Sequence, residues 1–195
     1  MKTILLVAAA ATLLADDEPA VPRANILIAT VKRGDLTRTV DGYGKLVRKG
    51  NAVEGLIDLP PGTNEVRAGE SVLVDVRSGL FHGTVKAIDA AGGGKQAVVM
   101  IDGSTAKLSG GETVAASIQV EKLPNILTLE RVGLVVAEQN LVLYRLNGEF
   151  ADRVEVQTGR MNTREVEIRS GLAEGDRVIV TEMKTANDQP RVKLQ

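Results

Sequence analysis

Alternation of apolar and polar residues with a period of two is the feature that most restricts how this chain can fold. Residues 113–120 place four apolar side chains on one face of an extended strand: Val114, Ala116, Ile118 and Val120. Residues 153–157 and 165–169 repeat the alternation, which is typical of strands with one buried face in antiparallel sheets. Past the first 15 residues, no window of about 11 residues keeps the 3.6-residue period of a helix. We therefore expect an all-β fold with few or no long helices.

A short turn pattern precedes three of the predicted strands. Each copy consists of a glycine, an acid, a variable residue and a valine: Gly69-Glu70-Ser71-Val72, Gly111-Glu112-Thr113-Val114 and Gly175-Asp176-Arg177-Val178. Glycine readily takes a positive φ, and the acid that follows can accept hydrogen bonds from nearby backbone N–H groups. The copies are unequally spaced, so we interpret them as repeated turn chemistry and not as a solenoid or propeller repeat.

The composition excludes several classes of function. The 195 residues carry a net charge of -1 with no dense run of Lys and Arg, which argues against binding to nucleic acid. The chain has no Cys and one His, so disulfides, thiol nucleophiles, Cys-ligated zinc and His-cluster metal sites are excluded. Aromatic residues make up 2% of the chain, which leaves few rings to stack on a flat ligand. We predict no catalytic residues, no cofactor and no metal ligands.

The N-terminus has the layout of a secretory signal peptide. Met1-Lys2-Thr3 leads into an apolar run over residues 4–14, which ends at Ala15 before an acidic stretch. We predict a signal peptide over residues 1–15 and export to the periplasm; retention of the segment as an uncleaved anchor is the alternative. Residues 16–24 contain two prolines and three acids and are predicted to form a flexible leader.

The composition changes near residue 123. Residues 51–122 are rich in glycine, as suits the loops of a small β-barrel. Leu123-Pro124-Asn125 follows as a predicted connector, because proline cannot donate a hydrogen bond within a central strand. Residues 126–195 are predicted to form a second β-rich module.

Segments of the first module resemble a known family. Residues 69–76, 80–88 and 108–114 read GESVLVDV, LFHGTVKAI and LSGGETV. They resemble the β-barrel domain of HlyD-type membrane fusion proteins, the periplasmic adaptor subunits of RND-type efflux pumps.

The second module is similar to the membrane-proximal domain of the same family. Its matching segments, in the family's order, are residues 127–135, 141–144, 153–159 and 166–180, and the part from 168 to 180, IRSGLAEGDRVIV, is the most specific. Residues 31–36 and 40–44 are similar to the strand that opens the family's mature chain. The resemblance implies that residues 25–48 pair with residues 126–195 to form a discontinuous membrane-proximal domain.

The chain departs from the family between Val47 and Gly69. Family members carry a lipoyl-like domain and a long α-helical hairpin in this region, whereas here the gap is short and no helical heptads occur. The resemblance implies a shortened adaptor that contacts an inner-membrane transporter of the RND or ABC type. Docking to an outer-membrane channel is not expected without the hairpin, and assembly into a homo-oligomer stays open.

Two motifs that suggest chemistry have simpler interpretations. Ser104-Thr-Ala-Lys107 fits the S-x-x-K signature of serine acylases, but the partner motifs of those enzymes are absent. Gly92-Gly-Gly-Lys95 lacks the flanking residues of a phosphate-binding loop and is predicted to be a hairpin loop. An exported hydrolase that uses Ser104 and Lys107 is therefore the weakest of the functional hypotheses.

The preferred hypothesis is a non-enzymatic periplasmic adaptor that acts in transmembrane transport through contacts between proteins. The alternative is a free-standing periplasmic β-scaffold or ligand-binding module that is not assembled into a pump. Because aromatic side chains are frequent anchors at protein interfaces, the four in this chain are the candidate partner contacts: Tyr43, Phe81, Tyr144 and Phe150. Of these, Tyr144 and Phe150 are expected to lie in the core of the second module.

Overall fold

The computed structural model describes residues 19–132, 140–181, 183 and 189–195; the predicted signal peptide lies outside these residues. The described part contains one short 3-10 helix, η1 (Arg23–Asn25), and thirteen strands. The strands are β1 (Ala20–Val21), β2 (Ile28–Thr30), β3 (Lys32–Lys49), β4 (Ala52–Asp58), β5 (Ser71–Val76), β6 (Gly79–Ala91), β7 (Gly94–Ile101), β8 (Thr113–Glu130), β9 (Asn140–Asn147), β10 (Phe150–Met161), β11 (Glu165–Ser170), β12 (Arg177–Ile179) and β13 (Arg191–Leu194). The prediction of an all-β fold is confirmed. No helix among the described residues has the length and apolar character needed to cross a bilayer.

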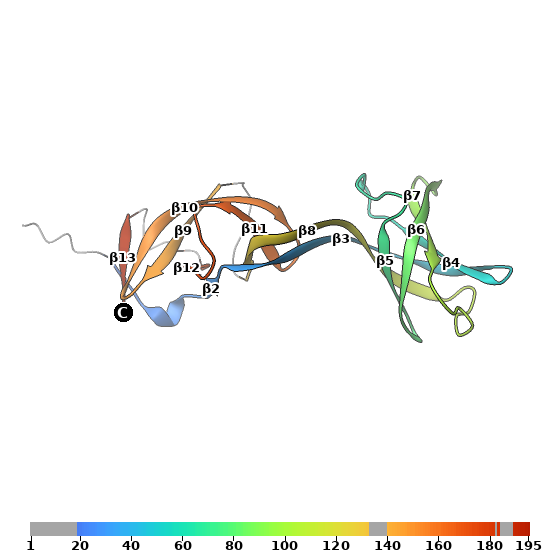
Figure 1. Ribbon diagram of the computed structural model, residues 1–195, viewed down its shortest axis with the longest axis horizontal. Helices are drawn as coiled ribbons and strands as arrows, with labels where there is room; N and C mark the ends of the chain where they lie inside the picture. The colour runs from blue at the N-terminus through green and yellow to red at the C-terminus, as the bar shows by residue number, and fades with distance from the viewer. Residues whose placement is uncertain (1–18, 133–139, 182, 184–188) are drawn as a thin grey trace, which may run out of the picture.

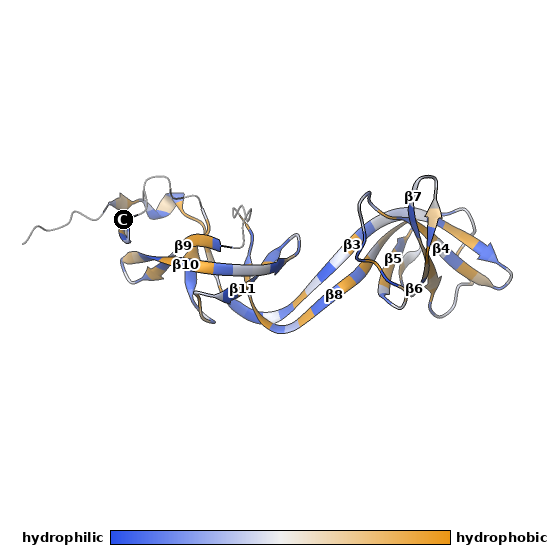
Figure 2. Ribbon diagram, turned by 90° about the horizontal axis from the view of Figure 1, so that it is seen from above, coloured by the Kyte–Doolittle hydropathy of each residue, from blue (hydrophilic) through white to orange (hydrophobic). Residues whose placement is uncertain are grey.

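Two modules lie at opposite ends of an elongated molecule and are joined by the long strands β3 and β8 (Figure 1). These two strands run antiparallel and are paired from Lys32↔Thr128 at one end to Lys45↔Thr113 at the other. The view from above shows the same arrangement, with β3 and β8 side by side between the modules (Figure 2). We call the middle of this pair, residues 34–39 of β3 and 119–126 of β8, the neck.

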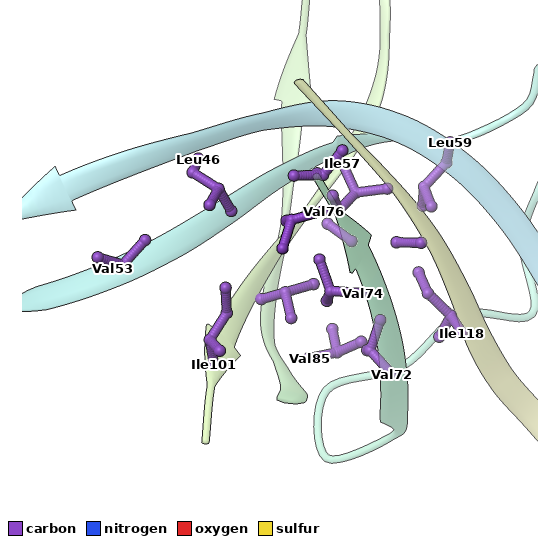
Figure 3. Packing of buried hydrophobic residues seen from close by; sticks show 14 of the residues in the cluster. Leu46, Val53, Ile57, Leu59, Val72, Val74, Val76, Val85, Ile101 and Ile118 are labelled. Atoms are coloured by element: carbon purple, nitrogen blue, oxygen red, sulfur yellow. The ribbon is translucent and has the colours of Figure 1, made fainter. Parts of the chain in front are cut away.

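The first module is a closed ring of six antiparallel strands in the order β3-β4-β7-β6-β5-β8. The ring closes because β8 pairs with β5 on one side and with β3 on the other. Alternate residues of each strand point into the ring and build a core of aliphatic side chains, among them Leu46, Ile57, Val74, Val85 and Ile118 (Figure 3). The alternation predicted for residues 113–120 is confirmed, since Val114, Ala116 and Ile118 are buried and Val120 packs against the same core.

The second module follows the order β2-β12-β9-β10-β11-β8-β3. Strands β2 and β3 are separated only by Val31, so one stretch of chain pairs with β12 through its first part and with β8 through its second. The enclosed core consists of aliphatic side chains, including Val31, Val156, Val166 and Ile168. A smaller cluster lies on the other face of β9 and β12 and is covered by β1 and β13: Val21, Tyr144, Ala151, Ile179, Val192 and Leu194.

The domain boundary predicted at residue 48 does not separate the core of the first module from the core of the second. Strand β3 runs through it without interruption, and its residues Val40 and Leu46 belong to the core of the first module. The sequence pattern follows single strands, whereas the assignment of a strand to a core depends on its partners, which are distant in sequence.

The predicted connector at Leu123-Pro124-Asn125 is wrong as a break between strands, because β8 continues through it. The pairing instead shifts here: Gly34 faces Ile126, and Leu36 faces Leu123. Pro124 and Asn125 of β8 thus oppose the single residue Asp35 of β3, which is a β-bulge, one of the places where a strand tolerates proline. Asn125 takes a positive φ of 54° at this bulge.

The prediction of a flexible leader is corrected for its described part, residues 19–24. Strand β1 pairs in parallel with β13, and Val21 is buried in the smaller cluster of the second module. The Arg23 N–H also donates to the carbonyl oxygen of Gln195 at 2.7 Å. The prolines on either side of β1 suggested a disordered segment, but a two-residue strand at a sheet edge requires few backbone donors.

The three glycine–acid turns share one hydrogen-bonding arrangement. Their glycines all have positive φ, from +87° to +93°. In each turn the glycine N–H donates to the carbonyl of a buried core residue, and the N–H of that residue donates to the carbonyl of the acid. The core residues are Val85 for Gly69, Leu46 for Gly111 and Val31 for Gly175. Each turn is therefore fastened to a core residue by two backbone hydrogen bonds of 2.7–2.9 Å.

Candidate partner-contact surface

The outer face of the first module carries exposed apolar side chains in two adjacent rows. The strand register places Tyr43, Ala115, Asp75 and Leu80 opposite one another across β3, β8, β5 and β6. Two residues further along, a second row contains Asp41, Ser117, Leu73 and His82. Residues directly opposite one another in paired strands point to the same face. We call these eight residues the β3–β6 face.

Three large apolar side chains stand out from this face. Tyr43 is 72% exposed, Leu80 is 63% exposed and Leu73 is 38% exposed. Ala115 and Ser117 of β8 are small and lie between Tyr43 on β3 and Leu73 on β5, and Asp75 lies between Ala115 and Leu80. The face therefore presents exposed apolar area on both sides of the small residues of β8, as protein-contact surfaces often do.

The position of Tyr43 follows from its two glycine neighbours. A Cβ at Gly44 would lie 1.8 Å from the carbonyl oxygen of Leu56, and one at Gly42 would lie 2.6 Å from that of Asp58. The glycines thus bring β3 close to β4 on the inner side of the strand. Tyr43, the residue between them, points outward.

The polar groups of the β3–β6 face do not form a catalytic arrangement. The Ser117 hydroxyl donates to an Asp41 carboxylate oxygen, and no third side chain among the described residues hydrogen-bonds to either group. Among the described residues, no group of three or more potential ligands could hold a metal ion. The face can make contacts through shape, apolar area and a few carboxylates.

A groove with a volume of about 270 Å³ extends from this face toward the second module. It is lined on the neck side by Arg38, Thr39 and Asp41, and on the other side by Arg131 and by the β10–β11 turn, Met161 to Thr163. Asp41 belongs both to the groove and to the β3–β6 face. The exposed surface is therefore continuous across the junction of the modules.

Charged residues of the neck are paired beside this groove. Arg38 donates to a carboxylate oxygen of Glu121 at 2.8 Å and to one of Glu65 at 2.8 Å. Arg160 donates to the other oxygen of Glu121 at 3.2 Å. The hydrogen bond from Arg38 is the largest of the causes that hold the pKa of the Glu121 carboxyl below its ordinary value.

The structure separates the four aromatic residues that were predicted as partner contacts. Tyr43 lies on the β3–β6 face, whereas Phe81 points to the other side of β6 and packs against the barrel core. Tyr144 is 5% exposed, and its hydroxyl donates to the carbonyl of Gln189 at 2.9 Å. Burial removes Tyr144 from the candidate surface contacts, in agreement with its expected place in the core of the second module.

Phe150 lies at the turn between β9 and β10 and is half-buried. The Arg191 guanidinium stands over its ring at 5.5 Å and donates to Asp152 at 2.6 Å. This contact is internal to the second module, far along the chain from Tyr43. The structure therefore does not bring the four aromatic residues together.

Sequence reasoning missed Leu73 and Leu80. Leu73 and Leu80 point to the outer face of the barrel, where the alternation predicts polar residues. The neighbouring Val72, Val74 and Phe81 point toward the core. The sequence did contain a signal, namely an apolar residue at a position where the alternation of the strand predicts an exposed polar one. It became specific only when the register placed both residues on the same face of the sheet as Tyr43.

The motifs with suggested chemistry lie elsewhere. Ser104 and Lys107 are exposed in the loop between β7 and β8. Gly92 and Gly93, with positive φ, form the predicted hairpin loop between β6 and β7, and Lys95 donates to the Asn64 side chain at 2.6 Å.

Residues 139–185 match the family model described as RND MFPs, C-terminal permuted SH3 domain. The chain is also similar to the crystal structure of MacA from Actinobacillus actinomycetemcomitans, with a TM-score of 0.57 and 21% identity over 70% of this chain and 44% of that chain. Two further solved structures match with lower TM-scores. A MacA–MexA chimera with the Pseudomonas aeruginosa MexA α-hairpin domain gives 0.48, with 19% identity over 64% of this chain and 44% of that chain. ZneB from Cupriavidus metallidurans gives 0.34, with 18% identity over 71% and 42%.

The match of residues 139–185 to the family model confirms the resemblance to membrane fusion proteins that the sequence indicates. No curated protein matches the chain. The chain spans less than half the length of each of the three solved proteins. Between Val47 and Gly69, where the family was expected to carry its lipoyl-like domain and helical hairpin, the described residues form the β3–β4 turn, β4 and a loop.

Proposed function

Because residues 139–185 carry the C-terminal permuted SH3 domain of the RND membrane fusion proteins, we propose that the chain is an adaptor subunit of an efflux or export system. In this proposal it acts in the periplasm, to which the predicted signal peptide would deliver it. Its role is non-enzymatic and depends on contact with an inner-membrane transporter.

The observation that carries the proposal is the β3–β6 face. Tyr43 and Leu80 are the most exposed large apolar side chains of the first module, and the register places them in one row. An exposed tyrosine and two exposed leucines on one face form an apolar surface that resembles a protein interface more than it resembles a ligand pocket. We assign the transporter contact to this face.

The geometry of the S-x-x-K motif supports a non-enzymatic role. Within the described residues, Ser104 and Lys107 lie on an exposed loop and are not joined by any hydrogen bond. A Ser–Lys nucleophile would require the two side chains within hydrogen-bond reach.

The proposal is tested by crosslinking in native membranes. A photoreactive amino acid replaces Tyr43, Leu80 or, as the matched control, Met100, which is 51% exposed. Met100 lies on β7, which stands opposite β8 in the ring. We expect crosslinks to a transporter subunit from positions 43 and 80 and none from position 100.

The pair of substitutions Tyr43→Ser and Leu80→Ser is expected to reduce recovery of the transporter at least about tenfold, since interface anchors often contribute 2 kcal/mol or more. Unchanged circular dichroism would show that the barrel remains folded. Equal crosslinking from all three positions, or from none of them, would contradict the assignment. A small molecule that raises the melting temperature in the absence of any transporter would instead favour the free-standing ligand-binding module.

A further inference from the structure

Two strands alone connect the modules at the neck. Each module has its own enclosed core, and the two cores share no residue. The neck strands carry two register shifts, one between Gly34 and Leu36 and one between Arg38 and Thr39. Bulges interrupt the ladder and increase local twist, so the neck is the place where the molecule can bend most easily.

Four charged side chains form a continuous row of ion pairs across the neck. Glu65 belongs to the barrel loop that follows β4, Arg38 and Glu121 belong to the two neck strands, and Arg160 belongs to β10 of the second module. The three contacts, in this order, measure 2.8, 2.8 and 3.2 Å. These ion pairs therefore link the first module, through both strands of the neck, to the second module.

A neutral hydrogen bond supports the same junction. The Asn162 side-chain amide, at the β10–β11 turn, donates to the Thr37 carbonyl of the neck at 3.0 Å. The Arg131 guanidinium in turn donates to the Asn162 carbonyl at 2.6 Å. The turn is thus held against the neck on the side where the groove opens.

We propose that Glu65, Arg38, Glu121 and Arg160 form an ionic latch that holds the two modules at one angle, with the bulged neck as its hinge. When the latch is closed, the β10–β11 turn stays on the neck and the groove keeps its width. When the ion pairs are broken, the neck bends and the modules sample a range of angles.

The arrangement differs from an isolated surface ion pair. Isolated exposed pairs contribute little because both long side chains must be ordered for a single contact. Here Arg38 and Glu121 each have two partners, and each side chain is only 26% exposed. One contact already orders the side chains of the central residues. The second contact therefore costs less side-chain entropy.

The absence of cysteine makes a direct measurement simple. Cysteines introduced at the exposed positions Asn51, in the β3–β4 turn, and Glu149, in the β9–β10 turn, carry a spin label at each end of the molecule. Double electron–electron resonance then reports the distribution of distances between the labels. We expect a single narrow distribution for the parent double-cysteine protein.

The Glu121→Gln variant removes the central carboxylate and is expected to lose this narrow distribution. Glu65→Gln removes one end of the latch and should broaden the distribution less. The matched control is Glu130→Gln, which breaks the 3.2 Å pair with Lys32 inside the second module and should leave the distribution unchanged. Raising the salt from ~0.1 M to ~1 M, which shortens the Debye length from about 10 Å to about 3 Å, should broaden the parent distribution.

Two outcomes would overturn the proposal. One is an unchanged distribution in both Glu121→Gln and Glu65→Gln. The other is equal broadening in Glu130→Gln, which would show that the loss of any carboxylate loosens the molecule. Because Glu65 lies in an exposed loop, its variant keeps the test informative if Glu121→Gln does not fold.

Discussion

Gly42 and Gly44 decide how closely strands β3 and β4 approach each other in the barrel. In the sequence, Gly42-Tyr43-Gly44 could be read as part of a dinucleotide-binding pattern, but the third glycine and a following helix are missing. The structure gives the two glycines a packing role, because a Cβ on either would collide with the backbone of β4. The sequence could locate the glycines but could not identify the strand that they face.

Gly44→Ala is expected to lower the free energy of unfolding by about 3 kcal/mol, because the added Cβ meets backbone atoms that cannot move without opening the ring. Gly34→Ala on the same strand is the control. A Cβ there would meet no atom within 4 Å, so the change should be neutral or stabilising by about 0.5 kcal/mol. Urea unfolding followed by circular dichroism measures both, and equal effects would refute the packing role.

Glu54 gives the barrel a predicted dependence on pH. Its carboxylate forms ion pairs with Lys49 at 2.7 Å and Lys86 at 2.9 Å, and the interactions with these lysines, Lys49 first, hold the pKa of Glu54 below its ordinary value of 4.5. The folded state therefore favours the charged form. The resulting stability is fully present above pH 4.5 and is lost as the pH falls through the lowered pKa.

Glu54→Gln should accordingly reduce the free energy of unfolding at pH 7 by about 1 kcal/mol, since both lysines are largely exposed. The difference between variant and parent should shrink as the pH falls below 4.5. Thermal unfolding at pH 7 and at a pH below 4 tests this expectation. A difference that stays constant over this range would show that the ion pairs are not its cause.

At the scale of elements, the glycine–acid turns were the most predictable feature. Their positive φ values and the acceptor role of the acid were expected from the sequence, and the carboxylates of Glu70 and Asp176 accept from the backbone N–H three residues earlier, at 2.9 Å in both. Their attachment to Val85, Leu46 and Val31 was not predictable, since it joins positions far apart in the chain. Neither was the bulge at Pro124, because its register depends on the partner strand.

Asp176→Ala is expected to cost about 1 kcal/mol, because the Ala173 N–H loses its charged acceptor. The third turn supplies the control. Among the described residues, no side-chain hydrogen bond ends on Glu112, so Glu112→Ala should change stability by less than about 0.5 kcal/mol. Chemical denaturation of the two variants side by side distinguishes them, and similar losses would show that the carboxylate of Asp176 is unimportant.

At the scale of the whole molecule, alternation along single strands was sufficient to predict the fold class but not the arrangement of the modules. The sequence alone predicts which side chains of residues 113–120 and 165–169 are buried. Closure of the ring requires β8 to pair with both β3 and β5. The β3–β6 face and the ionic latch likewise combine residues from separate segments, so only Tyr43 among their members was predicted from the sequence as a partner contact.

The continuity of β3 and β8 through both modules has a mechanical consequence. A force that pulls the two ends of the molecule apart acts along two covalent chains and not across a noncovalent interface between domains. The modules therefore cannot separate under load while these two strands stay intact. In the proposed adaptor role, tension between the two ends of the molecule would pass through this pair of strands.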